Sequence, residues 1–205
     1  MAGSEEVLAA FPGGVSRTQV TPTTQFRSTW LSSSLRSIRE RNLLESYLAH
    51  LPREHHDAVL STVVGVWLPA EIAVAHYAAC DRLGLTEQEQ VAIGAEVGRH
   101  AQGTVLSVAV SLAKGAGVTP WTIMTRFPSA WQRIWKGGGI SVIKLAPKDA
   151  RIEIAGWPCA RVPYARVALR GVISGLVELF CEKAYARELR ALCTQMTLAY
   201  RVSWA

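Results

Sequence analysis

The sequence predicts an α+β fold in which N-terminal helices precede a β-β-α-β-β segment that forms a mainly antiparallel sheet packed against helices. Of the 205 residues, 49% are hydrophobic and only 19% are charged, which is enough apolar material for a large core. Helical periodicity dominates the first two thirds of the chain, and residues 140–157 and 188–205 then contain alternating patterns. This grouping of helices before strands is typical of the α+β class.

The N-terminal segment differs from the rest of the chain. Residues 1–25 are rich in Gly, Pro, Thr and Gln and show no sustained period. We therefore predict a flexible N-terminal arm over 1–25 and one α+β domain of ligand-binding type over 26–205.

The helices of the first part are predicted from spacing and end signals. Apolar residues recur at helical steps over 35–51, where Pro52 ends the pattern. Thr86 followed by Glu89 forms a capping box that begins the longest predicted helix. The helices predicted before the sheet cover 35–51, 56–64, 67–84, 86–114 and 119–135.

The triplet Gly137–Gly139 separates this helical part from the predicted sheet. A phosphate-binding loop needs a strand before it and a helix after it. Here a helix precedes the glycines and a strand follows, so we interpret the triplet as a helix stop and a change of direction. Two strands are predicted over 140–146 and 150–157, a helix over 164–185, and a final strand pair within 188–205.

Charge and cysteine usage exclude several classes. The net charge is +6, but Lys and Arg are spread along the chain, so nucleic-acid binding is not predicted. No apolar run is long enough for a membrane span, and two acids near the N-terminus argue against a signal peptide, so we expect a cytoplasmic protein. The four cysteines form no CxxC pair, so neither a metal site nor a disulfide framework is predicted.

A few residues are candidates for a site. His76 and Cys80 share one face of a helix at a spacing of four, which can hold a metal or a haem iron, although a core histidine beside a buried thiol is the favoured interpretation. His100 is a second candidate, and Glu96 lies one turn before it. The seven tryptophans either fill the core or line a pocket for a flat apolar ligand. The predicted ligand-binding residues are Trp67, His76, Cys80, His100 and Trp135.

Several segments in order resemble a known group: "LRSIRERNLLESYLAHLP", "WLPAEIAVAHYAACDRLG", "GAEVGRHAQGTV", "FPSAWQRIWKGGGISV", "ARIEIAGWP" and "CTQMTLAYRVSW". The chain resembles a myxobacterial-type family of uncharacterised proteins of this length over residues 26–205. That family is related to 4-vinyl reductase-type small-molecule-binding domains and, more distantly, to haem nitric-oxide-binding domains and Golgi transport-particle subunits.

The resemblance implies helices and an antiparallel sheet around a hydrophobic ligand cavity, often in a dimer. The haem-binding relatives carry a Y-x-S-x-R signature that this chain lacks, which argues against haem. Cys193 matches the first of two cysteines common in vinyl-reductase-type domains, but Ala199 stands where the second would fall. No cofactor or metal is therefore predicted, and haem stays open as a less favoured alternative.

Three functions remain open from the sequence. The leading hypothesis is a non-enzymatic binding or sensory domain for a small apolar or aromatic ligand. The second is an enzyme acting on a hydrophobic or tetrapyrrole-like substrate, with His76 or His100 as acid–base and Glu96 as a partner. The third is a dimeric adaptor or structural protein. The pairs Gly94/Gly98 and Gly171/Gly175 permit close helix packing, inside the monomer or across the expected homodimer.

Overall fold

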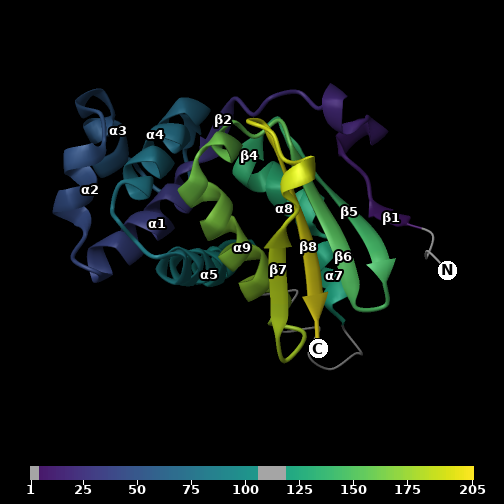
Figure 1. Ribbon diagram of the computed structural model, residues 1–205. Helices are drawn as coiled ribbons and strands as arrows, with labels where there is room; N and C mark the ends of the chain where they lie inside the picture. The colour runs from purple at the N-terminus through teal and green to yellow at the C-terminus, as the bar shows by residue number, and fades with distance from the viewer. Residues whose placement is uncertain (1–4, 106–118) are drawn as a thin grey trace.

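The structure is a computed structural model that describes residues 5–105 and 119–205, without the side chains of 100–105. An antiparallel sheet of five strands, in the order β1-β5-β6-β8-β7, forms one side of the molecule, and α2 and α3 lie at the opposite side (Figure 1). The predicted α+β class and the β-β-α-β-β order are confirmed. The elements concerned are β1 (Glu6–Ala9), β5 (Gly139–Ala146), β6 (Asp149–Ala155), α9 (Pro163–Val177), β7 (Ala184–Glu188) and β8 (Thr197–Trp204).

Strand β6 lies at the centre of the sheet and explains the alternating sequence pattern. It pairs with β5 on one side and with β8 on the other. Ile152 and Ile154 are fully buried, whereas Arg151 and Glu153 point to the other face and remain partly exposed. Apolar and polar residues alternate along β6 because one face of the sheet lies in the core and the other face is polar.

The helix predicted over 35–51 is two helices, α1 (Ser28–Glu40) and α2 (Leu44–His50). Asn42 between them has a φ of 58°, which is the left-handed conformation that commonly ends a helix. Asparagine tolerates this conformation better than most residues, so the continuous apolar spacing concealed a turn. Beyond Pro52, α3 (His56–Leu60) is shorter than the predicted 56–64.

Two other boundaries differ from the prediction because strand pairing outweighs helical propensity. The helix predicted over 67–84 begins only at Ala70 as α4 (Ala70–Asp81), because residues 67–69 form strand β3 (Trp67–Pro69). The helix predicted over 164–185 ends at Val177, and β7 occupies 184–188 as the antiparallel partner of β8. A small three-stranded sheet in the order β3-β2-β4 was not predicted. Its other strands are β2 (Gln25–Arg27) and β4 (Trp135–Lys136).

The four-spaced glycines pack inside the monomer, between α5 (Glu87–Val105) and α9. A Cβ atom at Gly94 would lie 1.8 Å from the carbonyl oxygen of Ala168, and one at Gly171 would lie 1.9 Å from that of Val91. The two backbones therefore touch. Of the two roles that the sequence left open for these glycines, packing inside the monomer or across a homodimer, the structure shows packing inside the monomer. The capping box that begins α5 is confirmed by mutual hydrogen bonds between Thr86 and Glu89, and the predicted part beyond Val105 lies outside the described residues.

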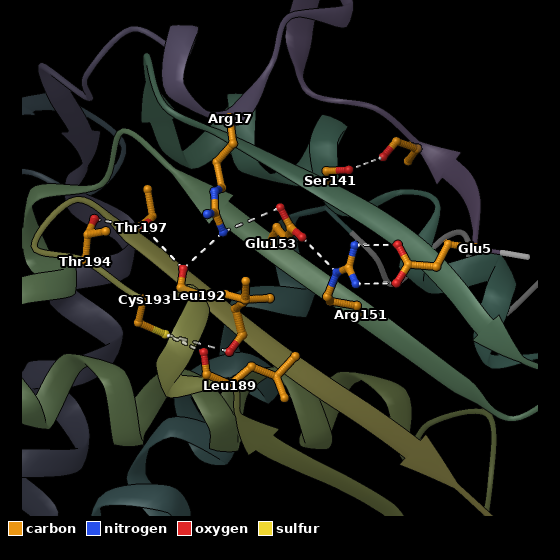
Figure 2. Close-up of polar contacts among 12 residues, drawn as sticks. Glu5, Arg17, Ser141, Arg151, Glu153, Leu189, Leu192, Cys193, Thr194 and Thr197 are labelled. Atoms are coloured by element: carbon orange, nitrogen blue, oxygen red, sulfur yellow. Dashed lines mark hydrogen bonds and ion pairs between the residues drawn. The ribbon is translucent and has the colours of Figure 1, made fainter. Parts of the chain in front are cut away.

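The N-terminal segment is not a free arm where the structure describes it. Strand β1 pairs with the edge of β5, and residues 12–14 and 17–19 form short 3₁₀ turns. Figure 2 shows a row of ion pairs on the polar face of the sheet, in which Glu5 contacts Arg151, Arg151 contacts Glu153, and Glu153 contacts Arg17. Backbone hydrogen bonds to the otherwise open edge of β5 hold this segment in place, and the local composition of the segment did not indicate them.

The glycine triplet changes the direction of the chain as predicted, but it does not end a helix, because α8 (Phe127–Ile134) ends before strand β4, which lies between that helix and Gly137. It follows α7 (Pro120–Met124), α8 and β4, and leads into β5. Gly137 and Gly138 have φ values of 79° and 64°, which few other residues adopt. Within the described residues, no helix has the length and apolar character needed to cross a membrane.

Candidate ligand-binding cavity

A cavity of about 410 Å³ lies between the sheet and the helices, a size typical of small-molecule sites. Its walls come from the apolar faces of β5, β6, α8 and α9, together with the start of α1. The lining is mainly apolar. The residues that line it are Arg27, Thr29, Trp30, Gly65, Tyr77, Gly98, Phe127, Ala130, Trp131, Arg133, Ile134, Trp135, Ile140, Ile152, Ile154, Trp157, Leu169, Val172, Ile173 and Leu176.

Three buried tryptophans form one wall. The rings of Trp131, on α8, and Trp135, the first residue of β4, stack at 5.6 Å. The ring of Trp157 meets both edge-on, at 6.0 Å from Trp131 and 5.7 Å from Trp135. Such a rigid aromatic surface suits the face of a flat apolar ligand.

Several polar groups of the wall can donate hydrogen bonds. Nε1 of Trp157 has no hydrogen-bond partner within the described residues, although the side chain is only 2% exposed. The hydroxyl of Tyr77 accepts a hydrogen bond of 2.8 Å from Nε1 of Trp30. Burial raises the pKa of Tyr77, so the hydroxyl keeps its proton and can still donate.

Two arginines lie at the opening. Arg27 is half-buried at the end of β2, and one of its Nη atoms donates to the carbonyl of Gly65. Arg133 is exposed on α8. Both therefore add positive charge to the lining of an otherwise apolar cavity.

Of the predicted ligand-binding residues, Trp135 lines the cavity and Trp67 does not. Trp67 lies on β3 beside the opening, where the Arg27 guanidinium stacks 4.2 Å from the centre of its ring and the Lys136 ammonium lies 4.7 Å away. Its role is therefore to orient the basic groups and not to form the wall.

His76 and Cys80 are together in the core and away from the cavity wall. Nδ1 of His76 is 2.9 Å from the Tyr47 hydroxyl, Nε2 is 2.9 Å from Oγ of Ser34, and Sγ of Cys80 is 3.8 Å from Nε2. Burial lowers the pKa of His76 to about 3 and raises that of Cys80, so both are neutral near pH 7. This geometry is that of a hydrogen-bonded core histidine beside a buried thiol.

The remaining candidates are not brought together. Glu96 pairs with Arg41, with Oε1 2.6 Å from Nη2, and this hydrogen bond lowers the pKa of the Glu96 carboxyl. The side chain of His100 lies outside the described part of the structure, so its predicted role stays a prediction. Among the described residues, no group of three His, Cys, Asp or Glu side chains could hold a metal ion.

Sequence reasoning did not select most of the wall. Trp131 could have been found from its spacing of four with Trp135 in the helix predicted over 119–135, although Trp135 itself lies on β4. Arg27, Trp30, Tyr77 and Trp157 come from distant segments and carry no local signal. Only the tertiary fold brings them to one cavity.

Comparisons with known proteins support the fold. No protein-family model and no curated protein matches the sequence. The structure is similar to an oxygen-binding H-NOX domain related to soluble guanylate cyclases, solved in its oxygen complex, with a TM-score of 0.57, 11% identity, and 87% of this chain and 94% of that one covered. It is also similar to an H-NOX structure from work on heme distortion (TM-score 0.56, 14% identity, 87% and 94% covered) and to one from work on H-NOX activation (0.52, 12%, 86% and 93%).

The comparisons thus agree with one part of the resemblance stated from the sequence, the distant relation to haem nitric-oxide-binding domains. They give no support to the vinyl-reductase and myxobacterial parts. At these identities the likeness concerns the fold.

Proposed function

We propose that this protein is a small-molecule-binding or sensory domain that holds a flat, mainly apolar ligand in the cavity. The observation that carries the proposal is the wall of Trp131, Trp135 and Trp157 around a space of about 410 Å³. Such a space offers a ligand a large apolar contact area at little conformational cost, because the tryptophans are already packed against one another.

The similar H-NOX domains raise the question of haem. A haem iron needs an axial ligand such as His, Cys, Met or Tyr. The described wall contains no His, Cys or Met, and Tyr77 is protonated and accepts a hydrogen bond from Trp30. The described residues of the wall therefore supply no axial ligand for haem, whereas the side chain of His100, two residues after Gly98 of the wall, lies outside the described part of the structure. The proposal is made for a ligand that needs no iron.

An enzymatic function finds no supporting geometry in the described residues. A general acid–base must reach the substrate, but His76 does not line the cavity and both ring nitrogens contact core hydroxyls. Burial also keeps this histidine neutral. Binding, not turnover, is the function that the cavity supports.

A fluorescence titration with 1-pyrenebutanol tests the proposal. This neutral flat alcohol absorbs where tryptophan emits, so binding beside the three tryptophans quenches their emission. Ala130 lines the cavity on α8, so Ala130→Trp fills part of the space and is expected to weaken binding by about tenfold or more. Native mass spectrometry of protein purified from its own source would show a ligand carried from the cell.

The neighbouring residue provides the matched control. Ser129 is exposed on the same helix, so Ser129→Trp adds the same indole outside the cavity and is expected to leave binding unchanged. Equal binding by the two variants would place the probe elsewhere and contradict the proposal. Absence of binding by the unmodified protein would contradict it as well.

The expected homodimer is part of the same proposal. The four-spaced glycines no longer support it, since they pack inside the monomer. Its support is now the resemblance and an exposed apolar segment beside the cavity opening, in which Val63, Val64 and Val66 are 70%, 64% and 40% exposed.

A further inference from the structure

The charge at the cavity opening has no counterion from the protein. Every Asp and Glu of the sequence lies within the described residues, yet neither Arg27 nor Arg133 forms an ion pair there. The other partly buried arginines do have carboxylate partners. These are Arg17, Arg41, Arg151, Arg166 and Arg170.

Arg27 is held in position and still has free donors. Its neighbour Ser28 is fully buried and fixes residues 63–66, since its Oγ donates to the carbonyl of Val63 (2.7 Å) and accepts from the amide of Val66 (3.0 Å). Arg27 donates to Gly65 in that segment and stacks on Trp67. A guanidinium has five N–H donors in a planar fork, so one such bond leaves an edge for an anion.

A second cation adds to this charge. Lys136 follows Trp135 on β4 and places its ammonium over the same Trp67 ring as Arg27. Two cations around one indole repel each other, and within the described residues Lys136 likewise has no ion-pair partner. An anion at the opening would relieve this repulsion.

The rest of the wall offers a ligand few acceptors. Apart from Thr29, whose hydroxyl can donate or accept, and Tyr77, whose hydroxyl accepts from Trp30 and keeps its own proton, the polar side chains of the wall are donors. A ligand with acceptor atoms therefore matches this lining better than a ligand with donors.

We infer that the ligand is an organic acid, with a flat apolar body among Trp131, Trp135 and Trp157 and an anionic head held by Arg27, with Arg133 and Lys136 nearby. This inference rests on the proposed function and specifies the chemical class of ligand. The carboxylate would pair with the free edge of the Arg27 guanidinium, and a neutral ligand of the same shape would leave that charge unmatched.

A matched pair of probes tests the inference. 1-Pyrenebutanoic acid and 1-pyrenebutanol share one ring system and chain length and differ in the charged head. At low ionic strength the unmodified protein is expected to bind the acid about tenfold more tightly than the alcohol, since charge-assisted hydrogen bonds are of that order. Added salt is expected to weaken acid binding and leave alcohol binding unchanged.

Variants locate the anionic end. Arg27→Gln is expected to remove most of the preference for the acid while the dissociation constant for the alcohol changes less than about twofold. Arg133→Gln is expected to have a smaller effect in the same direction. Arg126→Gln is the control, because Arg126 is an exposed arginine that precedes α8 and does not line the cavity.

The results distinguish a failure of this inference from a failure of the proposed function. If the alcohol binds but the acid binds no more tightly and shows no salt dependence, the inference is wrong and the proposed function stands. If neither probe binds, the proposed function fails. The comparison on the unmodified protein decides even if Arg27→Gln does not fold, since that arginine also holds the carbonyl of Gly65.

Discussion

At the scale of single residues, His76 shows how burial changes the role of a reactive side chain. Its imidazole lies among Tyr47, Ser34, Tyr77 and Cys80, with hydrogen bonds at both nitrogens. A charged imidazolium there would lose its hydration without gaining a carboxylate. The residue that looked most like a ligand in the sequence is therefore a neutral part of the core.

This placement predicts a specific pH dependence of stability. The pKa of His76 is about 3 in the folded protein and near 6.5 when unfolded, so below pH 6.5 the unfolded state binds a proton that the folded state does not. The contribution to the free energy of unfolding is complete above pH 6.5 and should fall by about 2 kcal/mol between pH 6.5 and 4.5. Urea unfolding over that range measures it.

The control for this experiment is a second histidine. His76→Gln removes the titration and should flatten the pH dependence, whatever its effect on stability at pH 7. His50 is exposed, so His50→Gln should keep the slope of the unmodified protein. Equal slopes for the two variants would show that His76 is not the buried neutral group described above.

At the scale of elements, the contact between α5 and α9 forms part of the cavity wall. Gly98 on α5 and Val172 on α9 both line the cavity and lie against each other, so the close approach of the two helices makes this part of the wall continuous. Glycine at Gly94 and Gly171 permits that approach because any Cβ would overlap a backbone carbonyl of the other helix.

Alanine substitutions on α5 should separate close approach from helix propensity. Gly94→Ala forces a Cβ to 1.8 Å from a backbone oxygen and is expected to cost about 3 kcal/mol or more, or to prevent folding. At Gly98 the nearest atoms would be 3.4 Å away, an ordinary contact, so Gly98→Ala is expected to be neutral or to stabilise by up to about 1 kcal/mol. Thermal unfolding measures both. Similar losses at the two positions would contradict the packing described.

At the scale of the whole molecule, two surfaces could bind a second copy: the polar face of the sheet and the exposed segment of residues 60–66. The N-terminal segment covers part of the sheet through β1 and the ion-pair row that ends at Arg17 (Figure 2). Nothing in the described chain covers the exposed side chains of Val63 and Val64. This surface is where we expect a second copy to bind.

Sedimentation equilibrium at micromolar concentration tests the homodimer. The expected mass is twice that of the 22.3 kDa chain. Val63→Asp is expected to shift the equilibrium towards monomer, because it places a charge in an apolar interface. Val7 is also exposed but lies on β1, so Val7→Asp is the control. A single species of 22.3 kDa for the unmodified protein would show the prediction wrong.

The sequence by itself determined the fold class, the order β-β-α-β-β, the capping box at Thr86 and the glycine turn at 137–138. Each of these depends on local chemistry, such as the period of apolar residues, a side chain that caps its own helix, or a left-handed backbone. The tryptophan count left open whether these residues fill the core or line a pocket.

Only the tertiary structure decided the rest. Strands β1, β2, β3 and β4 are short and exist because a distant strand supplies their hydrogen bonds, so no local pattern marks them. The same holds for the site, since Arg27, Tyr77 and Trp157 are far apart in sequence and meet only when helices and sheet pack. Whether a histidine is a ligand or a core residue depends on what surrounds it, and for His76 the surrounding hydroxyls and rings decided for the core.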